Sequence, residues 1–182
     1  MKTFFTRFGD DFAAIRRGSP DPLLTAARVL LYVLLAGVIL ATFFSILGLV
    51  IHVATQLPML FLVLDAAAWR PVAAHLFGLV ALGLIWSSVQ SLLGMIGTVD
   101  RGDTFDGGNV HRLEKIAGNI LGLQLLGTLA ALLGLQIGGD INGFDIGLKL
   151  SPGGMAVVLL LFILARVFRQ GAVMRDDLQG TV

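Results

Sequence analysis

Three long stretches without a charged residue or a histidine constrain this 182-residue chain more than any other feature. They cover residues 29–51, 76–99 and 116–139, and each exceeds the ~20 residues that a helix needs to cross a bilayer. A fourth apolar run, residues 150–165, is shorter, but Ser151 can cap a helix that has Pro152 at its first position. Only 14% of the residues are charged, against about a quarter in soluble domains, so the sequence predicts four transmembrane helices.

The predicted fold class is an all-α membrane protein, a four-transmembrane-helix bundle that forms one domain. The spans are expected at about residues 23–53, 73–97, 110–136 and 152–170, with a loop at 98–109 and a tail at 171–182. Of the 13 Lys and Arg residues, only Arg70 and Lys149 then lie on the side away from the termini. Because cytoplasmic segments are enriched in Lys and Arg, we expect both termini and the 98–109 loop to be cytoplasmic.

Two smaller elements are expected outside the spans. Apolar residues at helical spacing predict an N-terminal interfacial helix at about residues 3–17. On the other side of the membrane, residues 57–64 form a short apolar run, and residues 144–150 alternate between apolar and polar, which is typical of a strand. We expect these two segments to form a small extracytoplasmic β-element, although residues 57–64 fit an interfacial helix equally well.

The longest charged island reads TVDRGDTFDGGNVHRLEKIAGN, residues 98–119. Its RGD tripeptide would face the cytoplasm, away from any extracellular receptor. Its aspartates, at positions 100, 103 and 106, are three apart, whereas an EF-hand calcium loop places its ligands two apart. The remainder predicts a turn into the third span: residues 106–109 break the chain, Asn109 can serve as the N-cap, and an apolar stripe follows.

Polar side chains within the second and third spans form a candidate intramembrane cluster. They are Ser87, Ser88, Gln90, Ser91, Asn119 and Gln124. Because hydrocarbon offers no hydrogen-bond partner, such residues face other helices or a cavity, and so either hold helices together or line a polar path. Gly118 and Gly122 form a GxxxG step that allows close helix packing.

The sequence contains none of the motifs that mark common catalytic or metal sites. It has no G-x-S-x-G, H-E-x-x-H or Walker motif and no cysteine, and no acidic residue or histidine lies deep within a span. His52, Asp65 and His75 fall near the outer face, but their spacing does not match that of metal ligands on a helix. We therefore expect no enzymatic activity, no cofactor and no metal.

The loop and the tail resemble a family of bacterial membrane proteins, the domain of unknown function 2975 family. In the loop the similar residues are Gly102, Phe105, Asn109, Arg112 and Leu113. In the tail they are Val167, Phe168, Gly171, Asp176 and Asp177. Thr104 stands where the family loop usually has proline, and Met174 where leucine is common. The resemblance implies a four-helix protein of the bacterial inner membrane that has no established activity and is often encoded beside a small helix-turn-helix protein.

Three hypotheses for the function follow, and the lipid bilayer is a partner in each. The leading one is a non-enzymatic membrane sensor or anchor that binds a small cytoplasmic DNA-binding regulator and does not itself bind nucleic acid. Its interaction surface would be the cytoplasmic loop, residues 98–115, which contains the five loop residues of the resemblance, and the cytoplasmic tail, residues 169–182. The second is a small transporter or lipid-binding bundle with a polar cleft between the second and third spans. The third is a homo-oligomer that assembles through the face of Gly118 and Gly122.

Overall fold

The computed structural model of the chain describes residues 22–60, 66–135, 140–141, 144–145 and 150–179. The long helices are α2 (Pro22–Leu60), α3 (Ala66–Val99), α4 (Gly107–Leu132) and α5 (Pro152–Gln179). Each is long and apolar enough to span a membrane, and the most apolar 18-residue stretches of the four helices have mean hydropathies of 2.7, 1.9, 1.4 and 1.9. The predicted all-α class with four spans is therefore confirmed, while the expected interfacial helix at 3–17 lies outside the described residues.

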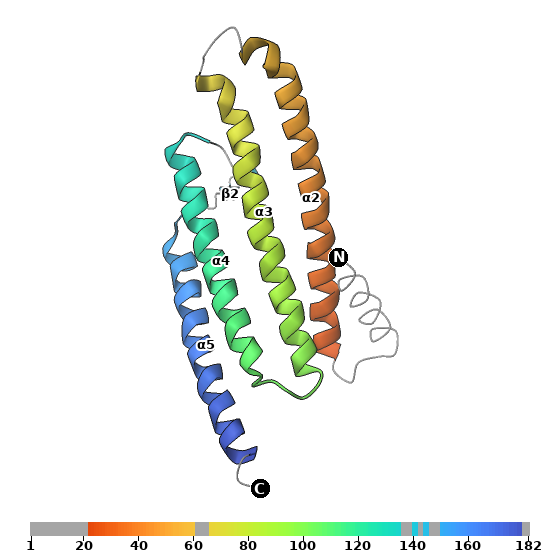
Figure 1. Cartoon of the computed structure of the whole chain (residues 1–182), viewed down its shortest axis with the longest axis vertical. Coiled ribbons are helices and arrows are strands. Elements are labelled where there is room, and N and C mark those ends of the chain that lie inside the picture. The colour runs from red at the N-terminus through yellow and green to blue at the C-terminus, as the bar shows by residue number, and fades with distance from the viewer. Residues whose placement is uncertain (1–21, 61–65, 136–139, 142–143, 146–149, 180–182) are drawn as a thin grey trace.

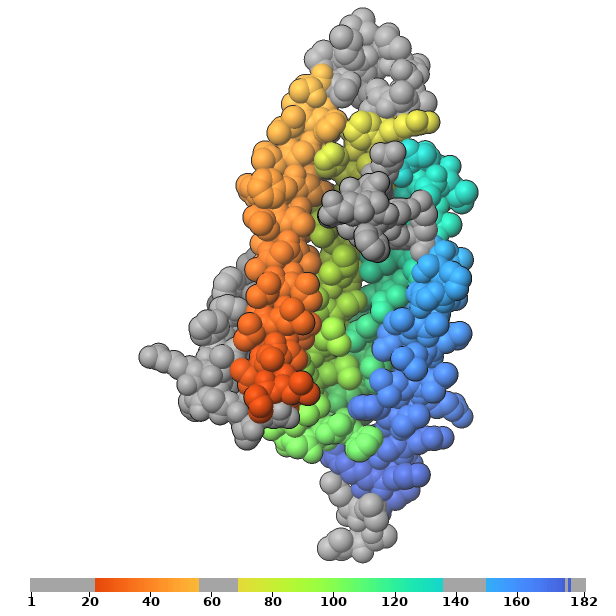
Figure 2. Space-filling view, turned by 180° about the vertical axis from the view of Figure 1, so that it is seen from behind, coloured from red at the N-terminus to blue at the C-terminus, as the bar shows by residue number. Residues whose placement is uncertain are grey.

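The four helices pack as antiparallel neighbours in the order of the chain (Figure 1). α3 and α4 lie in the middle, and α2 and α5 lie at the two edges. Seen from behind, α3 and α4 are visible between the two edge helices (Figure 2). One apolar cluster, centred on Leu35 and Val89, joins α2 to α3, and another, centred on Leu113 and Ala165, joins α4 to α5.

Most of the large apolar side chains point away from these clusters. Phe43 of α2 is 61% exposed, and Leu160 of α5 is 63% exposed. Exposing this much apolar surface to water would be unfavourable, because removing apolar surface from water lowers the free energy by about 25 cal/mol for each Å². The exposed apolar surface of all four helices therefore fits a lipid environment.

Glycine in the left-handed conformation ends both α3 and α4. At the end of α4, Gly134 has φ +68°, and the Leu135 amide donates to the Ala130 carbonyl at 2.8 Å. At the end of α3, Gly102 has φ +75°, and the Asp103 amide donates to the Thr98 carbonyl at 3.0 Å. These are Schellman motifs, which satisfy the last carbonyls of a helix. The RGD tripeptide is thus part of a helix stop, and Gly134 explains why α4 ends at Leu132 rather than near 136.

The β-element differs from the expected one. β1 (Asp140–Ile141) pairs antiparallel with β2 (Phe144–Asp145), its neighbour along the chain. Residues 57–60 belong to the end of α2, so the expectation that they join the β-element was wrong for these residues. They are helical, but as the continuation of α2 rather than as a separate interfacial helix. A local hairpin closes a much shorter loop than a pairing with residues 57–64 would, so it costs less chain entropy. Residues 61–65 and 146–149 lie outside the described ranges.

Candidate functional site at the α3–α4 loop

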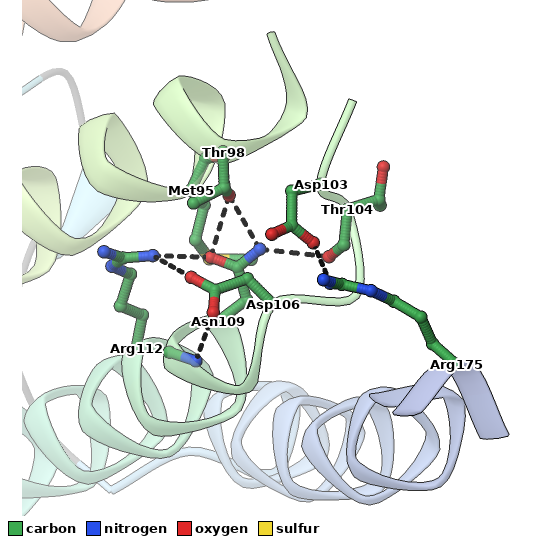
Figure 3. A network of polar contacts seen from close by, with 9 residues as sticks. Met95, Thr98, Asp103, Thr104, Asp106, Asn109, Arg112 and Arg175 are labelled. Carbon is green, nitrogen blue, oxygen red and sulfur yellow. Dashed lines mark hydrogen bonds and ion pairs between the residues drawn. The ribbon is translucent and has the colours of Figure 1, made fainter. Parts of the chain in front are cut away.

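The side chain of Asn109, in the first turn of α4, holds the α3–α4 loop in place (Figure 3). This residue is 0% exposed. Its Nδ2 donates to Thr98 Oγ1 at 2.7 Å and to the Thr104 carbonyl at 3.0 Å. Its Oδ1 accepts from Arg112 Nη1 at 2.7 Å. Because all of its hydrogen-bonding groups are used inside the protein, Asn109 ties the end of α3, the loop and α4 into one unit.

The N-cap of α4 is Asp106, and the prediction that Asn109 caps this helix was wrong. Asp106 has extended backbone angles, φ −60° and ψ 130°, and its carboxylate accepts from the Gly108 amide at 3.2 Å. Asn and Asp are both strong N-cap residues, so the sequence alone does not choose between them. The choice is made by packing, because Asn109 faces inward, where Thr98 is only 1% exposed.

Each of the three loop aspartates pairs with an arginine from a different helix. Asp100 binds Arg28 of α2, and Asp103 binds Arg175 of α5. The third pair joins Asp106 to Arg112 of α4, with 3.7 Å between Asp106 Oδ2 and Arg112 Nη1. A fourth ion pair, Arg169 with Glu114, joins α5 to α4 nearby. The three-residue spacing that does not fit a calcium loop thus lets successive carboxylates reach different helices, and sequence reasoning missed this role.

Phe105 packs its ring against α5. The centroids of the Phe105 and Phe168 rings are 5.5 Å apart, and the planes are inclined by 48°. A Cβ atom added at Gly171 would lie only 2.6 Å from the Phe105 ring, so only glycine leaves room for this contact. Phe105 is nevertheless 43% exposed. One side of the ring is therefore fixed by α5 and another is open to the surroundings.

An open hollow of about 400 Å³ lies beside the Phe105 ring. It is lined by Gly102, Asp103, Thr104, Phe105 and Arg175. The loop supplies four of these residues and α5 supplies one, and the Asp103–Arg175 ion pair joins the two walls. We call this end of the bundle, made of loop residues 100–106 and the adjoining ends of α4 and α5, the loop face.

Arg112 and Leu113 support the loop from within. Arg112 crosses α3 at Gly94, where an added Cβ would lie 2.8 Å from Arg112 Nε. Together with its bonds to Asn109 and Asp106, this contact places the guanidinium inside the loop network. Leu113 is buried in the cluster between α4 and α5. Of the five predicted interaction residues, Gly102 and Phe105 are exposed, whereas Asn109, Arg112 and Leu113 hold the loop in shape.

A comparison with protein families identifies the chain. The profile of the family described as "Protein of unknown function (DUF2975)" matches residues 64–182. The chain belongs to the DUF2975 family. The match contains α3, α4 and α5 and therefore the whole Asn109 network, whereas α2 precedes it. No curated protein and no solved structure matches the chain.

Six of the residues that carry the resemblance to the DUF2975 family meet at the loop face. Gly102 ends α3, Phe105 lies on Phe168 and Gly171, and Asn109 binds Arg112. Thr104, at the position where the family loop usually has proline, contributes only its backbone carbonyl to the Asn109 network. Proline also has a carbonyl, so either residue allows this bond.

The predicted intramembrane cluster of this DUF2975 protein is divided into two parts. In the first, Asn119 Nδ2 of α4 donates to Ser88 Oγ of α3 at 3.1 Å. Ser88 and Ser91 also donate to carbonyls of their own helix, those of Leu84 and Ser87. Within the described part of the chain, Gln90 Nε2 is buried without a hydrogen-bond partner. The structure thus joins Asn119 to Ser88 and leaves Gln90 outside their hydrogen bonds.

The second part lies at the start of α5. Gln124 Oε1 accepts from the Ser151 amide at 3.1 Å, and Thr128 Oγ1 accepts from the Leu150 amide at 2.9 Å. Ser151 Oγ accepts from the Gly154 amide at 3.0 Å, which confirms Ser151 as a cap of α5. An added Cβ at Gly154 would collide with the Gln124 side-chain amide. The α4 side chains therefore fix where α5 begins.

The GxxxG step contributes one contact among the described residues. An added Cβ at Gly122 would lie 3.4 Å from Leu84 of α3, so this glycine faces the neighbouring helix. Gly118 is exposed, and an added Cβ there would meet nothing within 4 Å. The two glycines thus do not act together in packing α4 against α3.

Proposed function

We propose that this DUF2975 protein is a non-enzymatic sensor or anchor of the bacterial inner membrane, and that its loop face docks a cytoplasmic protein. The single observation that carries the proposal is the state of Phe105, which is held against Gly171 and Phe168 and still 43% exposed. Aromatic side chains presented by a rigid support are the usual energetic centres of protein interfaces. The partner that the family resemblance implies is a small helix-turn-helix regulator.

The charge of the loop face favours a partner with an acidic surface. Asp100, Asp103, Asp106 and Glu114 are each engaged by an arginine. In contrast, three exposed cations of this end form no ion pair with any described residue: Arg101, Lys115 and Arg166. A surface with unpaired cations attracts anionic partners and steers their approach.

The proposal requires the loop face to lie in the cytoplasm. Among the described residues, seven of the eight basic ones lie toward this end, and Arg70 lies toward the other: Arg28, Arg101, Arg112, Lys115, Arg166, Arg169 and Arg175 make up the seven. Such a bias favours cytoplasmic placement of the loop face. The same expectation puts both termini in the cytoplasm.

A single-cysteine experiment tests this placement, and no native cysteine has to be removed, because the chain has none. A cysteine at exposed Arg101 should react with a membrane-impermeant maleimide only after the cells are opened. A cysteine at exposed Trp69, near the start of α3, should react in intact cells. Labelling of the Arg101→Cys variant in intact cells would overturn the proposed function.

The contacts of the intramembrane polar residues give less support to the alternative of a small transporter or lipid-binding bundle. Asn119 and Ser88 bind each other, and Gln124 binds the start of α5. These hydrogen bonds hold helices together, which is the commoner role of polar residues in membrane helices. The homo-oligomer through Gly118 stays a prediction, for which the exposure of Gly118 leaves room.

A further inference from the structure

Two exposed cations lie where the uncharged parts of α4 and α5 end. Lys115 is followed in α4 by residues 116–132, and Arg166 is preceded in α5 by residues 152–165, and neither stretch contains a charged residue. Both cations are exposed, and neither forms an ion pair with any described residue. Uncharged helix fits the hydrocarbon of a bilayer, and long cationic side chains at its border extend to the headgroups. Lys115 and Arg166 therefore mark the headgroup level of one leaflet.

The two cations lie on the same side of the α4–α5 pair. α4 and α5 are antiparallel neighbours (Figure 1), and the ion pair of Glu114 with Arg169 marks one side of their contact. On α4, successive residues turn by about 100°, from Leu113 in the contact with α5, through Glu114, to Lys115 on the outer side. On α5, Arg166 precedes Arg169 by three residues, so the two lie on one face. Lys115 and Arg166 thus flank the ion pair.

This side of the α4–α5 pair is positively charged. The carboxylate of Glu114 is engaged by Arg169, whose side chain is still 59% exposed. With Lys115 and Arg166, the group has three cations and one carboxylate, a net charge of +2. Basic residues on neighbouring helices at a membrane surface bind the phosphate groups of anionic lipids, and guanidinium groups match phosphate oxygens in a bidentate manner.

Toward the uncharged part of both helices, the neighbouring surface has room for hydrocarbon. Gly118 lies one turn beyond Lys115 on α4, is exposed, and has nothing within 4 Å of an added Cβ. On α5, Phe162 lies one turn from Arg166 and is 43% exposed. An acyl chain below the bound headgroup would therefore meet a helix surface without a side chain and an apolar ring.

We propose that an anionic phospholipid binds here, with its phosphate at Lys115, Arg166 and Arg169. Its acyl chains lie over Gly118 and Phe162. The site is on the outer side of α4 and α5, away from the polar residues between α3 and α4. It does not rest on the proposed docking function, since its ligand is a lipid of the surrounding leaflet.

Native mass spectrometry of the full-length chain in detergent tests this proposal, with phosphatidylglycerol as the probe and phosphatidylcholine of the same acyl chains for comparison. The wild type should bind phosphatidylglycerol at least about tenfold more tightly. Lys115→Gln and Arg166→Gln should each weaken this binding about fivefold, the contribution of one basic residue at an anionic membrane surface. Arg101→Gln is the matched control, because Arg101 is also exposed and forms no ion pair with any described residue, but lies in the loop. It should bind phosphatidylglycerol as the wild type does.

Glycerol 3-phosphate distinguishes a phospholipid from a free phosphate group. It has the phosphate but no acyl chains, so a large molar excess should leave phosphatidylglycerol bound. Both substituted side chains are exposed, so the helical circular dichroism of the variants should equal that of the wild type. Equal affinity of the wild type for the two phospholipids would overturn the site. So would displacement by glycerol 3-phosphate, or an equal loss of binding in Arg101→Gln.

Discussion

Asn109→Leu lowers the free energy of unfolding by roughly 2–4 kcal/mol, the largest stability effect that we expect from any single substitution at the loop face. Leucine is close to asparagine in size but forms no hydrogen bond. Thr98 Oγ1, in a residue that is only 1% exposed, would lose a donor at 2.7 Å, and the half-buried Arg112 guanidinium would lose an acceptor at 2.7 Å. A buried polar group left without its partner costs ~1–3 kcal/mol, and a charged one costs more.

Asn119→Leu is the matched control, since it changes the same residue type on the same helix. Asn119 is half-buried and has one cross-helix bond, to Ser88 at 3.1 Å. Hydrogen bonds of this kind between membrane helices average about 0.6 kcal/mol. Titration with sodium dodecyl sulfate in mixed micelles, followed by circular dichroism, gives the free energy of unfolding of the wild type and of both variants. If Asn109→Leu and Asn119→Leu lower the free energy of unfolding by the same amount, Asn109 does not hold the loop together.

Phe105→Ala should reduce the amount of docked cytoplasmic partner at least about tenfold while leaving the helices folded. Truncation of an aromatic side chain at the centre of an interface commonly costs 2 kcal/mol or more, and ~1.4 kcal/mol already corresponds to a factor of ten. The measurement is quantitative mass spectrometry of proteins that co-purify with the tagged chain in mild detergent. Leu132→Ala is the control, because Leu132 is an apolar residue, 80% exposed, at the far end of α4.

Gly171→Ala tests whether the position of the Phe105 ring matters as well as its presence. The added methyl would collide with the ring at 2.6 Å, so Phe105 must leave its place on α5 and docking should fall as it does in Phe105→Ala. Gly153→Ala, on the same helix but with nothing within 4 Å of the added Cβ, should dock as the wild type does. Retention of every co-purifying protein by Phe105→Ala and Gly171→Ala would show that docking does not use this ring.

The spans could be predicted from the sequence because a charge-free run of sufficient length has few alternatives to crossing a membrane. The ends of the helices were harder to predict, because they depend on local capping interactions. Gly134 ends α4 earlier than the apolar run suggests, and α5 continues to Gln179, past the predicted end at 170. Apolar runs report where a helix is in contact with lipid, whereas caps and packing decide where it stops.

The loop residues could be selected from the sequence, but their roles could not. An asparagine that caps a helix and one that is buried in the first turn after the cap both precede an apolar stripe, so the sequence pattern does not distinguish them. Asn109 is the buried one. The ion pairs Arg28–Asp100 and Asp103–Arg175 each join residues 72 positions apart. Such pairs follow from which helices are neighbours, which a single sequence does not specify. The sequence did indicate that such ion pairs could form, because it places the three aspartates and most of the basic residues at the same end of the helix bundle.

The most direct test of the docking proposal is photo-crosslinking in living cells with a photoreactive phenylalanine analogue in place of Phe105. The side chain at this position is partly exposed and would lie in the proposed interface. We expect an adduct with a soluble cytoplasmic protein, and loss of that adduct when Asn109→Leu is added. The same analogue at Leu132 should form no such adduct. If the analogue at position 105 reacts only with lipid, or with the same proteins as the analogue at Leu132, the loop face does not dock a cytoplasmic protein.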